Sequence, residues 1–291
     1  MASNLSTCVI SVCSLSHKHV WRLTSQLLLR FVEADAFVVF VPSHEIERFK
    51  EITSPRIRVM SQDHLGKDYS EKLLAAVKSS SLATSRYGWY FQQYHKIAAL
   101  IQIQAESLVI WDADCVPLRP INLFDKEKKP IYMEAKENHQ DYFLMIKQLL
   151  GLAKVHDHSF VIPGFPIHKT WMQEMIAEIE SRHYPKTWYE AVILCTDFNL
   201  TSGFSETETL GTWVSNLYPG QWTTSLISWE RYGQSRFGYA KSFSVEELVK
   251  VGREHNLDVV SFENWDVRGW RRLFKRAKNL PRYFLATIRG A

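Results

Sequence analysis

The chain of 291 residues lacks long apolar runs, internal repeats and low-complexity segments, and it contains only four cysteines. No stretch reaches the roughly 18–20 uninterrupted apolar residues of a membrane-spanning helix, so the sequence predicts none. Residues 1–14 do not combine a basic segment with a long apolar one, which argues against a signal peptide and for a cytoplasmic protein. The cysteines show no metal-ligand spacing and are expected to be reduced packing residues: Cys8, Cys13, Cys115 and Cys195.

Charge is distributed unevenly along the chain. The composition is that of a soluble globular protein, with 46% hydrophobic and 23% charged residues, and the formal net charge is +4. Residues 267–291 contain eight basic side chains and no acidic one, so the rest of the chain carries four more acidic than basic groups. We expect one continuous domain over residues 1–266, followed by a basic tail.

The tail has the pattern of an amphipathic helix that ends at Pro281. One helical stripe collects the apolar side chains Trp270, Leu273, Phe274, Ala277 and Leu280. A basic amphipathic helix is typical of a segment that lies on an anionic membrane, at about 1 kcal/mol for each basic residue near the surface. We therefore expect a peripheral membrane contact at residues 267–291, with docking on the acidic body as the alternative. No nucleic-acid partner is expected, because no recognised binding motif is present.

Apolar periodicity predicts an α/β fold with a mostly parallel sheet covered by helices. The expected strands are 8–13, 36–41, 57–60 and 107–111, and the expected helices between them are 21–32, 71–80 and 90–105, with a capped helix start at 43–47. Residues 1–125 form this regular half, and residues 126–266 are less regular. The elements expected there are helices 140–153, 169–182 and 244–255 and a strand at 257–262.

The most informative motif is Asp112-Ala113-Asp114, directly after the apolar run 107–111. Pro117 and Pro120 follow, and they are not expected to continue a central strand. The two carboxylates therefore emerge at the end of a buried strand, where open α/β sheets bind ligands. Carboxylates at this spacing can share one Mg²⁺ or Mn²⁺ ion, whose remaining ligands are usually phosphate oxygens and water. The motif indicates chemistry on a diphosphate; without this context, a solvated turn is an equally common explanation.

Two further groups of polar residues accompany the motif. Gln92, Gln93 and Lys96 fall on about one turn near the start of the preceding helix, a place that favours anions. Glu206 and Glu208 lie at a second helix start, where Ser205 is the expected N-cap and Glu208 completes a capping box. A carboxylate there can hold or activate an acceptor hydroxyl, and only one of the two is expected to meet the substrate directly. The alternative for the first group is that its members are ordinary polar residues of a surface helix, and for the two glutamates that they only cap their helix.

Several other clusters are less specific. A polar cluster follows the metal motif, comprising Glu134, Glu137, His139, Asp141 and Tyr142. The segment His156-Asp157-His158 has the residue types of a metal site, but loop histidines of this kind are usually solvated. Seven of the ten tryptophans lie between Trp171 and Trp270; such side chains stack well on sugars, although most of them are expected simply to pack.

Taken together, these motifs resemble a glycosyltransferase-like family of mostly bacterial proteins, long labelled as of unknown function and related to nucleotide-sugar transferases of the GT-A fold. The resemblance covers about residues 5 to 230. It rests on Gly88 to Gln93 with Lys96, on Trp111 to Asp114, on Ser159-Phe160 and on Phe204 to Glu208.

The resemblance implies a metal-dependent transfer of a sugar from a nucleotide-diphosphate donor to a glycan or glycolipid acceptor, with Mn²⁺ or Mg²⁺ as the metal. Residues 1–125 would be the nucleotide-binding half and residues 126–266 the acceptor half. It assigns Asp112 and Asp114 to the metal, Ser11, Gln92, Gln93, Lys96 and Asp112 to the donor, and Glu206 and Glu208 to catalysis. His255 is a candidate third metal ligand. The sequence departs from the family pattern after the first strand, where Ser14 to His19 contain no acidic residue.

Two other functions fit parts of the pattern. In haloacid-dehalogenase-type phosphatases, Asp112 would be the nucleophile and Asp114 the acid/base, but those proteins need a later acidic pair that we do not find. A GT-A-like domain that binds a glycan or a partner without transfer is the other alternative. Metal and nucleotide binding that depends on Asp112 and Asp114 would separate the transferase from this non-catalytic domain.

Overall fold

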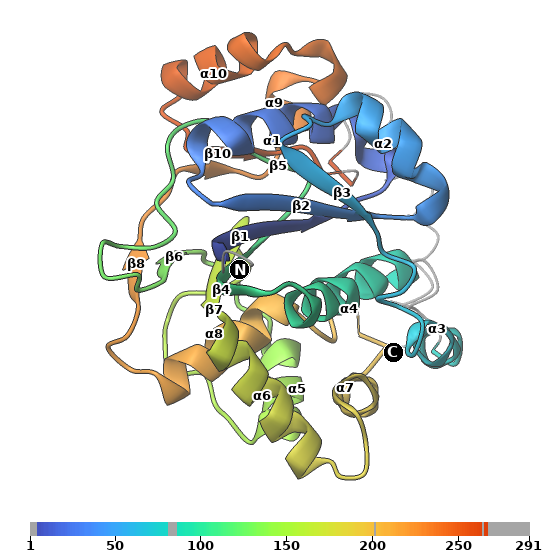
Figure 1. The fold of residues 1–291 in the computed structure, drawn as a ribbon. Helices are drawn as coiled ribbons and strands as arrows, with labels where there is room; N and C mark the ends of the chain where they lie inside the picture. Colours follow the sequence, from blue (N-terminus) through green and yellow to red (C-terminus); the bar gives the residue numbers. More distant parts are fainter. Residues whose placement is uncertain (1–4, 81–85, 201, 264, 267–291) are drawn as a thin grey trace, which may run out of the picture.

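A five-stranded sheet forms the centre of the protein (Figure 1). The structure, a computed structural model, describes residues 5–80, 86–200, 202–263 and 265–266. The strand order is β3-β2-β1-β4-β7; the first four strands are parallel and β7 is antiparallel to β4. Their bounds are β1 Leu5–Val12, β2 Ala36–Val41, β3 Ile57–Ser61, β4 Ala105–Trp111 and β7 Gly164–His168. The expected α/β class with a mostly parallel sheet is confirmed.

The order of the strands determines where the sheet can bind a ligand. From β1 the chain builds outward through β2 to β3, and it then returns to add β4 on the other side of β1. The helical connections after β1 and after β3 therefore lead to strands on opposite sides of β1. A crevice outside the carboxyl ends of two such strands is the usual ligand site of an open α/β sheet.

Helices cover both faces of the sheet (Figure 1). The helices α1 and α2 lie over one face, and α4 and α6 over the other, where α5, α7 and α8 add a further layer. Their bounds are α1 Lys18–Phe31, α2 Ile46–Ile52, α3 Ser70–Lys78, α4 Tyr87–Gln102, α5 Gln140–Leu150, α6 Lys169–Arg182, α7 Trp188–Cys195 and α8 Glu206–Leu217.

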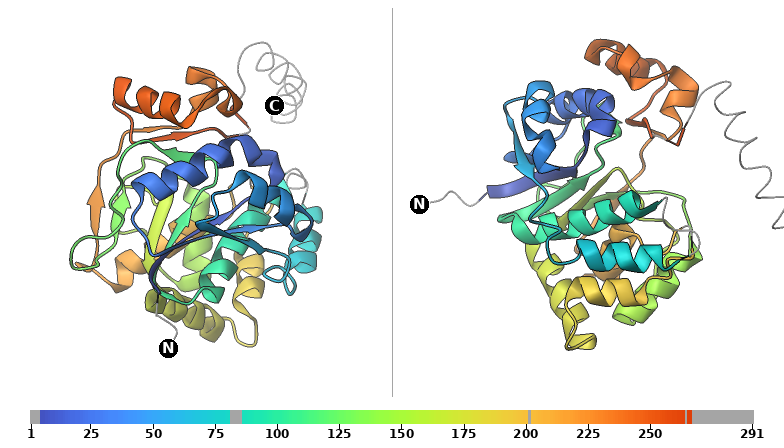
Figure 2. Two further views of the ribbon diagram at one scale, coloured as in Figure 1. Left: turned by 45° about the horizontal axis from the view of Figure 1, so that its top comes forward. Right: turned by 90° about the vertical axis from the view of Figure 1, so that its right-hand side faces the viewer.

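The end of the described chain returns to the first half and packs on α1 (Figure 2). This segment contains α9 Gly233–Phe237, α10 Val245–Glu254 and β10 Val259–Ser261. Strand β10 lies between β5 Cys115–Pro117 and β9 Trp229–Glu230 in a second sheet. A third, two-stranded sheet pairs β6 Ile131–Met133 with β8 Thr223–Ser225. The chain thus leaves the central sheet after Trp111 as expected, but Pro117 ends a short strand of the second sheet.

Most predicted elements agree with the structure to within a few residues. The ranges of β2 and α6 agree fully with prediction, and Ser244 and Glu247 form the predicted capping box of α10. The prediction missed α7, which Thr187 and Glu190 start with a capping box of their own. It also missed the strands β5 to β9 and the helix α9, because elements of two to five residues are too short to show a periodicity.

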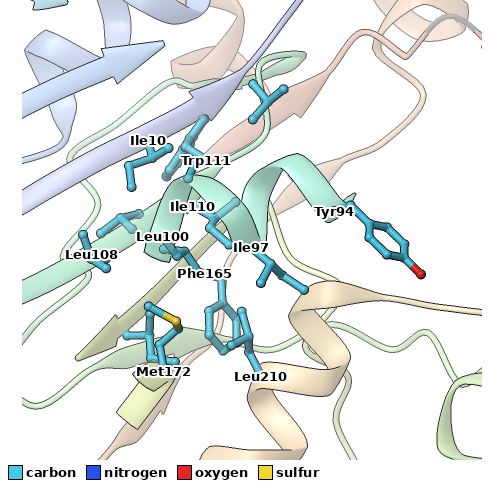
Figure 3. Close-up of a cluster of buried hydrophobic side chains, with 14 of the residues drawn as sticks. Ile10, Tyr94, Ile97, Leu100, Leu108, Ile110, Trp111, Phe165, Met172 and Leu210 are labelled. Atoms are coloured by element: carbon cyan, nitrogen blue, oxygen red, sulfur yellow. The ribbon is translucent and has the colours of Figure 1, made fainter. Parts of the chain in front are cut away.

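The main core covers both faces of the sheet, and Figure 3 shows the part that lies on the α4 side. Ile10 and Ile110 from β1 and β4 meet Ile97 and Leu100 from α4 there, and Trp111 is fully buried at the end of its strand. The four cysteines are free and buried, as expected. No helix among the described residues is long and apolar enough to span a bilayer. The predicted basic tail, residues 267–291, lies outside the described residues.

Helix α8 packs closely against the segment that precedes β7. A Cβ atom on Gly211 would overlap the ring of Phe160. We expect Gly211→Ala to lower the free energy of unfolding by about 1–3 kcal/mol, the usual cost of overpacking a core. The matched control is Gly88→Ala in α4, where an added Cβ would meet nothing within 4 Å. This variant should be neutral or up to about 1 kcal/mol more stable. Urea denaturation measures both, and equal stabilities of the two variants would contradict the packing argument.

His95 makes the stability depend on pH. Its ring is fully buried and accepts or donates a hydrogen bond at Nδ1 with the Tyr69 hydroxyl (2.8 Å). Burial lowers the pKa of His95 to about 4 from the ordinary 6.5. Between these values the unfolded chain binds the proton and the folded chain does not. Above pH 6.5 His95 is neutral in both states and does not favour unfolding. As the pH falls from 6.5 to 4, protonation of this residue in the unfolded chain lowers the free energy of unfolding by about 1.4 kcal/mol per pH unit.

Urea unfolding at a series of pH values tests this assignment. The stability difference between the wild type and His95→Asn should shrink as the pH falls from 6.5, because the variant lacks the titrating ring. His64→Asn, at an exposed position, serves as the control and should follow the wild-type profile. Parallel profiles for the wild type and His95→Asn would show that another group governs the pH dependence.

Candidate active site at the ends of β1 and β4

The Asp112–Asp114 turn is held rigidly by backbone contacts. The amide of Cys115 donates to the carbonyl of Asp112 (3.0 Å), and the indole of Trp111 donates to the carbonyl of Cys115 (2.8 Å). From α1, the Thr24 hydroxyl donates to the carbonyl of Ala113 (2.9 Å). These bonds fix the backbone of the turn without using either carboxylate. The turn therefore keeps its shape without either acidic side chain.

A lysine ammonium joins the turn to the start of α8. Lys96 Nζ donates to Asp112 Oδ1 at 2.5 Å and to Glu206 Oε1 at 2.6 Å. The side chains of Lys96 and Glu206 are 8% and 5% exposed, whereas that of Asp112 is 33% exposed. Helix α4, the end of β4 and the first turn of α8 thus meet at one buried positive charge, and of these three side chains Asp112 is the one that also faces solvent.

The charges of Lys96, Asp112 and Glu206 stabilise one another, whereas Asp112 and Asp114 repel each other. Burial alone would lower the pKa of Lys96, but the negative charges and hydrogen bonds of Asp112 and Glu206 outweigh it and raise the pKa. Burial, and then the charge of Asp112, raise the pKa of Asp114 to about 6. The site therefore concentrates negative charge that a single ammonium does not fully neutralise. Such a place favours a further cation.

The other residues predicted to bind the donor lie around this cluster. Gln92 Nε2 donates to the carbonyl of Val12 at the end of β1 (3.2 Å), and Gln93 Oε1 accepts the amide of Glu206 (3.1 Å). Among the described residues, Gln93 Nε2 is buried without a hydrogen-bond partner. Ser11 lies beneath the site, because its buried hydroxyl donates to the carbonyl of Trp111 (2.8 Å) and joins β1 to β4.

The two glutamates of α8 point to different partners. Ser205 caps the helix as predicted, accepting the amide of Glu208 (3.2 Å). Glu208 does not complete the predicted capping box; its Oε2 accepts the amide of Phe160 (2.6 Å) and the hydroxyl of Ser159 (3.0 Å). Burial raises the pKa of Glu208, although these hydrogen bonds oppose the shift. The Ser159-Phe160 pair thus binds an acidic residue of α8.

The structure adds Glu263 and Arg231, which the sequence analysis missed. The amide of Phe262 donates to the carbonyl of Asp114 (2.9 Å), which brings the next residue, Glu263, to the turn. Burial, and then the charge of Asp114, raise the pKa of Glu263 to about 7. Arg231 forms ion pairs with Glu263 (3.2 Å) and with Glu137. An acidic residue directly after the predicted strand at 257–262 was the available signal.

His255, the proposed third metal ligand, is placed elsewhere. It is exposed at the end of α10, where its ring packs on Phe237 at 5.0 Å. Within the described parts of the chain, no three His, Cys, Asp or Glu side chains are already arranged around a common metal position. After β1, where the sequence lacks an acidic residue, Glu45 Oε2 accepts the amide of Leu15 (2.7 Å). A carboxylate from the start of α2 therefore reaches this loop.

The sequence matches the model of a family described as "Family of unknown function (DUF6492)" over residues 19–233. The chain belongs to this family. The matched range includes Lys96, Asp112, Asp114 and Glu206, and it ends before Glu263. A search of curated protein sequences found no significant match.

Solved structures with a similar architecture include several transferases. Apo mouse xyloside xylosyltransferase 1 is 10% identical, with a TM-score of 0.48 over 90% of this chain and 99% of that chain. Apo glycosyltransferase GlyE of Streptococcus pneumoniae TIGR4 is 10% identical, with a TM-score of 0.38 over 90% and 55%. The 4-diphosphocytidyl-2C-methyl-D-erythritol synthase of Anaerococcus prevotii DSM 20548 is 11% identical, with a TM-score of 0.37 over 86% and 96%. The likeness concerns the general α/β architecture.

Removal of the Lys96 charge should destabilise the protein strongly. Lys96→Met leaves the buried carboxylate of Glu206 without a counter-charge, and breaking a buried pair in this way costs about 3–5 kcal/mol. Adding Glu206→Gln to Lys96→Met should recover part of the loss, because the uncompensated charge disappears. Urea denaturation measures both variants. Arg30→Met is the control, since its pair with Glu246 is exposed. A loss of less than about 1 kcal/mol in Lys96→Met would mean that the cluster behaves as a surface pair.

Proposed function

We propose that this protein is a metal-dependent glycosyltransferase that moves a sugar from a nucleotide-diphosphate donor to a glycan or glycolipid acceptor. The proposal rests chiefly on the position of Asp112 and Asp114 at the carboxyl end of β4, beside β1, where the direction of strand addition changes. A ligand at this edge of the sheet would meet two carboxylates on a fixed backbone turn on one side and the start of α8 on the other.

The residues at the turn suit a hard divalent cation. Mg²⁺ and Mn²⁺ prefer oxygen ligands and are commonly held by one or two carboxylates together with substrate phosphates and water. Asp112 and Asp114 supply such a pair, and the exposed fraction of Asp112 lets an ion arrive from solvent with its phosphates. These two residues would hold the metal, with Glu263 close to Asp114. The bound ion would neutralise charge that develops on the diphosphate leaving group.

The donor would lie between the loop after β1 and the start of α4. Gln93 Nε2 is a buried hydrogen-bond donor that is still free for a ligand, among the described residues. Lys96 donates to two carboxylates and its side chain is only 8% exposed, so we assign it to positioning Asp112 and Glu206 and to the positive potential of the site, not to a direct phosphate contact. The loop at Leu15, held by Glu45, would border the nucleoside.

The acceptor would approach from the α8 side. Lys96 binds both Glu206 and Asp112, and Asp112 belongs to the turn that would hold the metal. A hydroxyl bound by Glu206 would therefore lie close to the donor. A carboxylate in this place can orient the hydroxyl or accept its proton. Glu208 is buried against Phe160 and would position this end of α8.

A thermal-shift panel tests the proposal directly. Diphosphates of uridine, guanosine, thymidine and cytidine are added with and without Mn²⁺ to the wild type and to Asp112→Asn and Asp114→Asn. A ligand at about 100 times its dissociation constant stabilises by roughly 2.7 kcal/mol, which raises the melting temperature by several degrees. We expect a Mn²⁺-dependent shift with one diphosphate, and its loss in both variants, because each replaces a charged carboxylate with a neutral amide, which binds a divalent cation more weakly.

Two further variants make the result specific. Asp68→Asn removes an exposed carboxylate away from the turn and should keep the wild-type shift. Glu206→Gln should keep the donor-dependent shift but lose sugar transfer, because its role is on the acceptor side. No shift with any nucleotide in the wild type would contradict a donor site. Release of phosphate from p-nitrophenyl phosphate that depends on Asp112 would support the phosphatase instead. Donor binding without transfer to any acceptor would support the alternative of a binding domain that has no transferase activity.

A further inference from the structure

The second sheet brings a further basic side chain, that of Arg231, to the turn after β4. Strand β5 begins directly after Asp114, and β10 lies between β5 and β9. Ser261 of β10 is opposite Cys115 of β5, and the register between β10 and β9 brings it level with Arg231, the residue directly after β9. Neighbouring strands lie about 4.8 Å apart, so the backbones of Arg231 and Cys115 are separated by roughly 10 Å. An arginine side chain can span much of this distance.

Two carboxylates from different segments hold the guanidinium of Arg231. Its Nη2 pairs with Glu263 at 3.2 Å, and its Nη1 pairs with Glu137, which lies between β6 and α5. The ring of Trp229 packs against the guanidinium at 4.9 Å, and its indole donates to Ser261 Oγ (2.7 Å). The guanidinium therefore has a defined place before any substrate binds.

Glu263 connects this guanidinium to the turn that carries Asp112 and Asp114. The amide of Phe262 donates to the carbonyl of Asp114 (2.9 Å), so the next side chain, that of Glu263, starts beside the turn. The other end of Glu263 binds Arg231. An ion held by the turn would therefore have the guanidinium as a close neighbour, one carboxylate away.

Arg231 differs from Lys96 in how far it faces solvent. The side chain of Arg231 is 31% exposed, and that of Lys96 is 8% exposed. Each terminal nitrogen of a guanidinium carries two N–H groups, so one ion pair at Nη1 and one at Nη2 leave an N–H at each nitrogen for another acceptor. The Nε atom, by contrast, is buried and would not meet a ligand. Arg231 can thus keep both carboxylate partners and still bind an anion.

The carboxyl groups around the turn outnumber its basic side chains. Five carboxyl groups lie in the turn or in contact with Lys96 or Arg231, and they belong to Asp112, Asp114, Glu137, Glu206 and Glu263. This excess attracts a divalent cation but repels the phosphates that arrive with it. A guanidinium offsets such repulsion, because its planar fork of N–H donors matches the oxygens of a phosphate.

We propose that Arg231 is a catalytic residue that binds the diphosphate of the nucleotide donor through its terminal N–H groups; this inference rests on the proposed function. In the transfer, the bond between the sugar carbon C1 and the diphosphate oxygen breaks, and its electron pair stays on the diphosphate. A bond forms between C1 and the acceptor oxygen, and the proton of that hydroxyl goes to a base, for which Glu206 is the candidate. The guanidinium would stabilise the negative charge that develops on the diphosphate.

Calorimetric titration of the full chain with the diphosphates of uridine, guanosine, thymidine and cytidine, at saturating Mn²⁺, tests the proposal. The diphosphate that binds the wild type should bind about tenfold more weakly to Arg231→Met, which loses a charge-assisted hydrogen bond. Arg231→Lys keeps the charge without the fork and should weaken binding only about threefold. Arg236→Met is the matched control and should bind like the wild type, because this nearby arginine pairs with Glu230. Circular dichroism melting shows that each variant is folded.

Two further measurements separate phosphate binding from a purely structural bridge. Mn²⁺ binding without nucleotide, followed by electron paramagnetic resonance of the free ion, should be unchanged or tighter in Arg231→Met, because a positive charge beside the turn is lost. Glu137→Gln weakens the same bridge but keeps the guanidinium, so it should bind the diphosphate at least as tightly as the wild type. A structural bridge alone predicts that Glu137→Gln and Arg231→Met weaken the diphosphate equally.

The outcomes distinguish this assignment from the proposed function. If the wild type binds a diphosphate and Arg231→Met binds it equally well, or if Glu137→Gln weakens it as much as Arg231→Met does, the Arg231 assignment fails and the donor site stands. A loss of Mn²⁺ affinity in Arg231→Met would also overturn the assignment, because the residue would then act only by positioning Glu263. If the wild type binds none of the diphosphates with Mn²⁺, the donor site itself is contradicted, and the assignment falls with it.

Discussion

The arrangement of the candidate site depends on one buried positive charge. Lys96 Nζ lies within hydrogen-bond distance of both Asp112 and Glu206, which belong to elements far apart in the sequence. Two carboxylates in a largely buried site would repel each other and would be costly to desolvate without a counter-ion. The ammonium removes this penalty and also fixes the distance between the end of β4 and the start of α8. The proposed donor and acceptor sides of the site are therefore joined by a single side chain.

The surrounding fold holds this cluster without using the functional groups. The turn after β4 is closed by backbone bonds and by the indole of Trp111, and the start of α8 is capped by Ser205. Glu208 is tied to Phe160, and α8 approaches Phe160 closely because Gly211 has no side chain. Rigid support of this kind keeps reactive side chains in place, so that little ordering is needed when substrates bind.

The two halves predicted from the sequence are closely combined in the structure. Strand β7 from the second half extends the sheet of the first half, and α10 and β10 from the end of the described chain pack beside α1 and β5. This return brings Glu263 to Asp114, whereas α8 of the middle segment brings Glu206 to Lys96. A transferase needs two substrates to meet at one point, and the chain builds the two sides of the proposed site from interleaved segments.

The sequence by itself determined the fold class, most of the long elements and the strand-end position of Asp112 and Asp114, because apolar periodicity and helix capping are local signals. It also selected Lys96 and Glu206 as functional candidates. Only the tertiary structure decided that these two side chains bind each other, that Glu208 faces Phe160, and that Glu263 replaces His255 beside the turn. Contacts between residues more than a hundred positions apart depend on how the sheet and helices pack, and no local pattern encodes that packing.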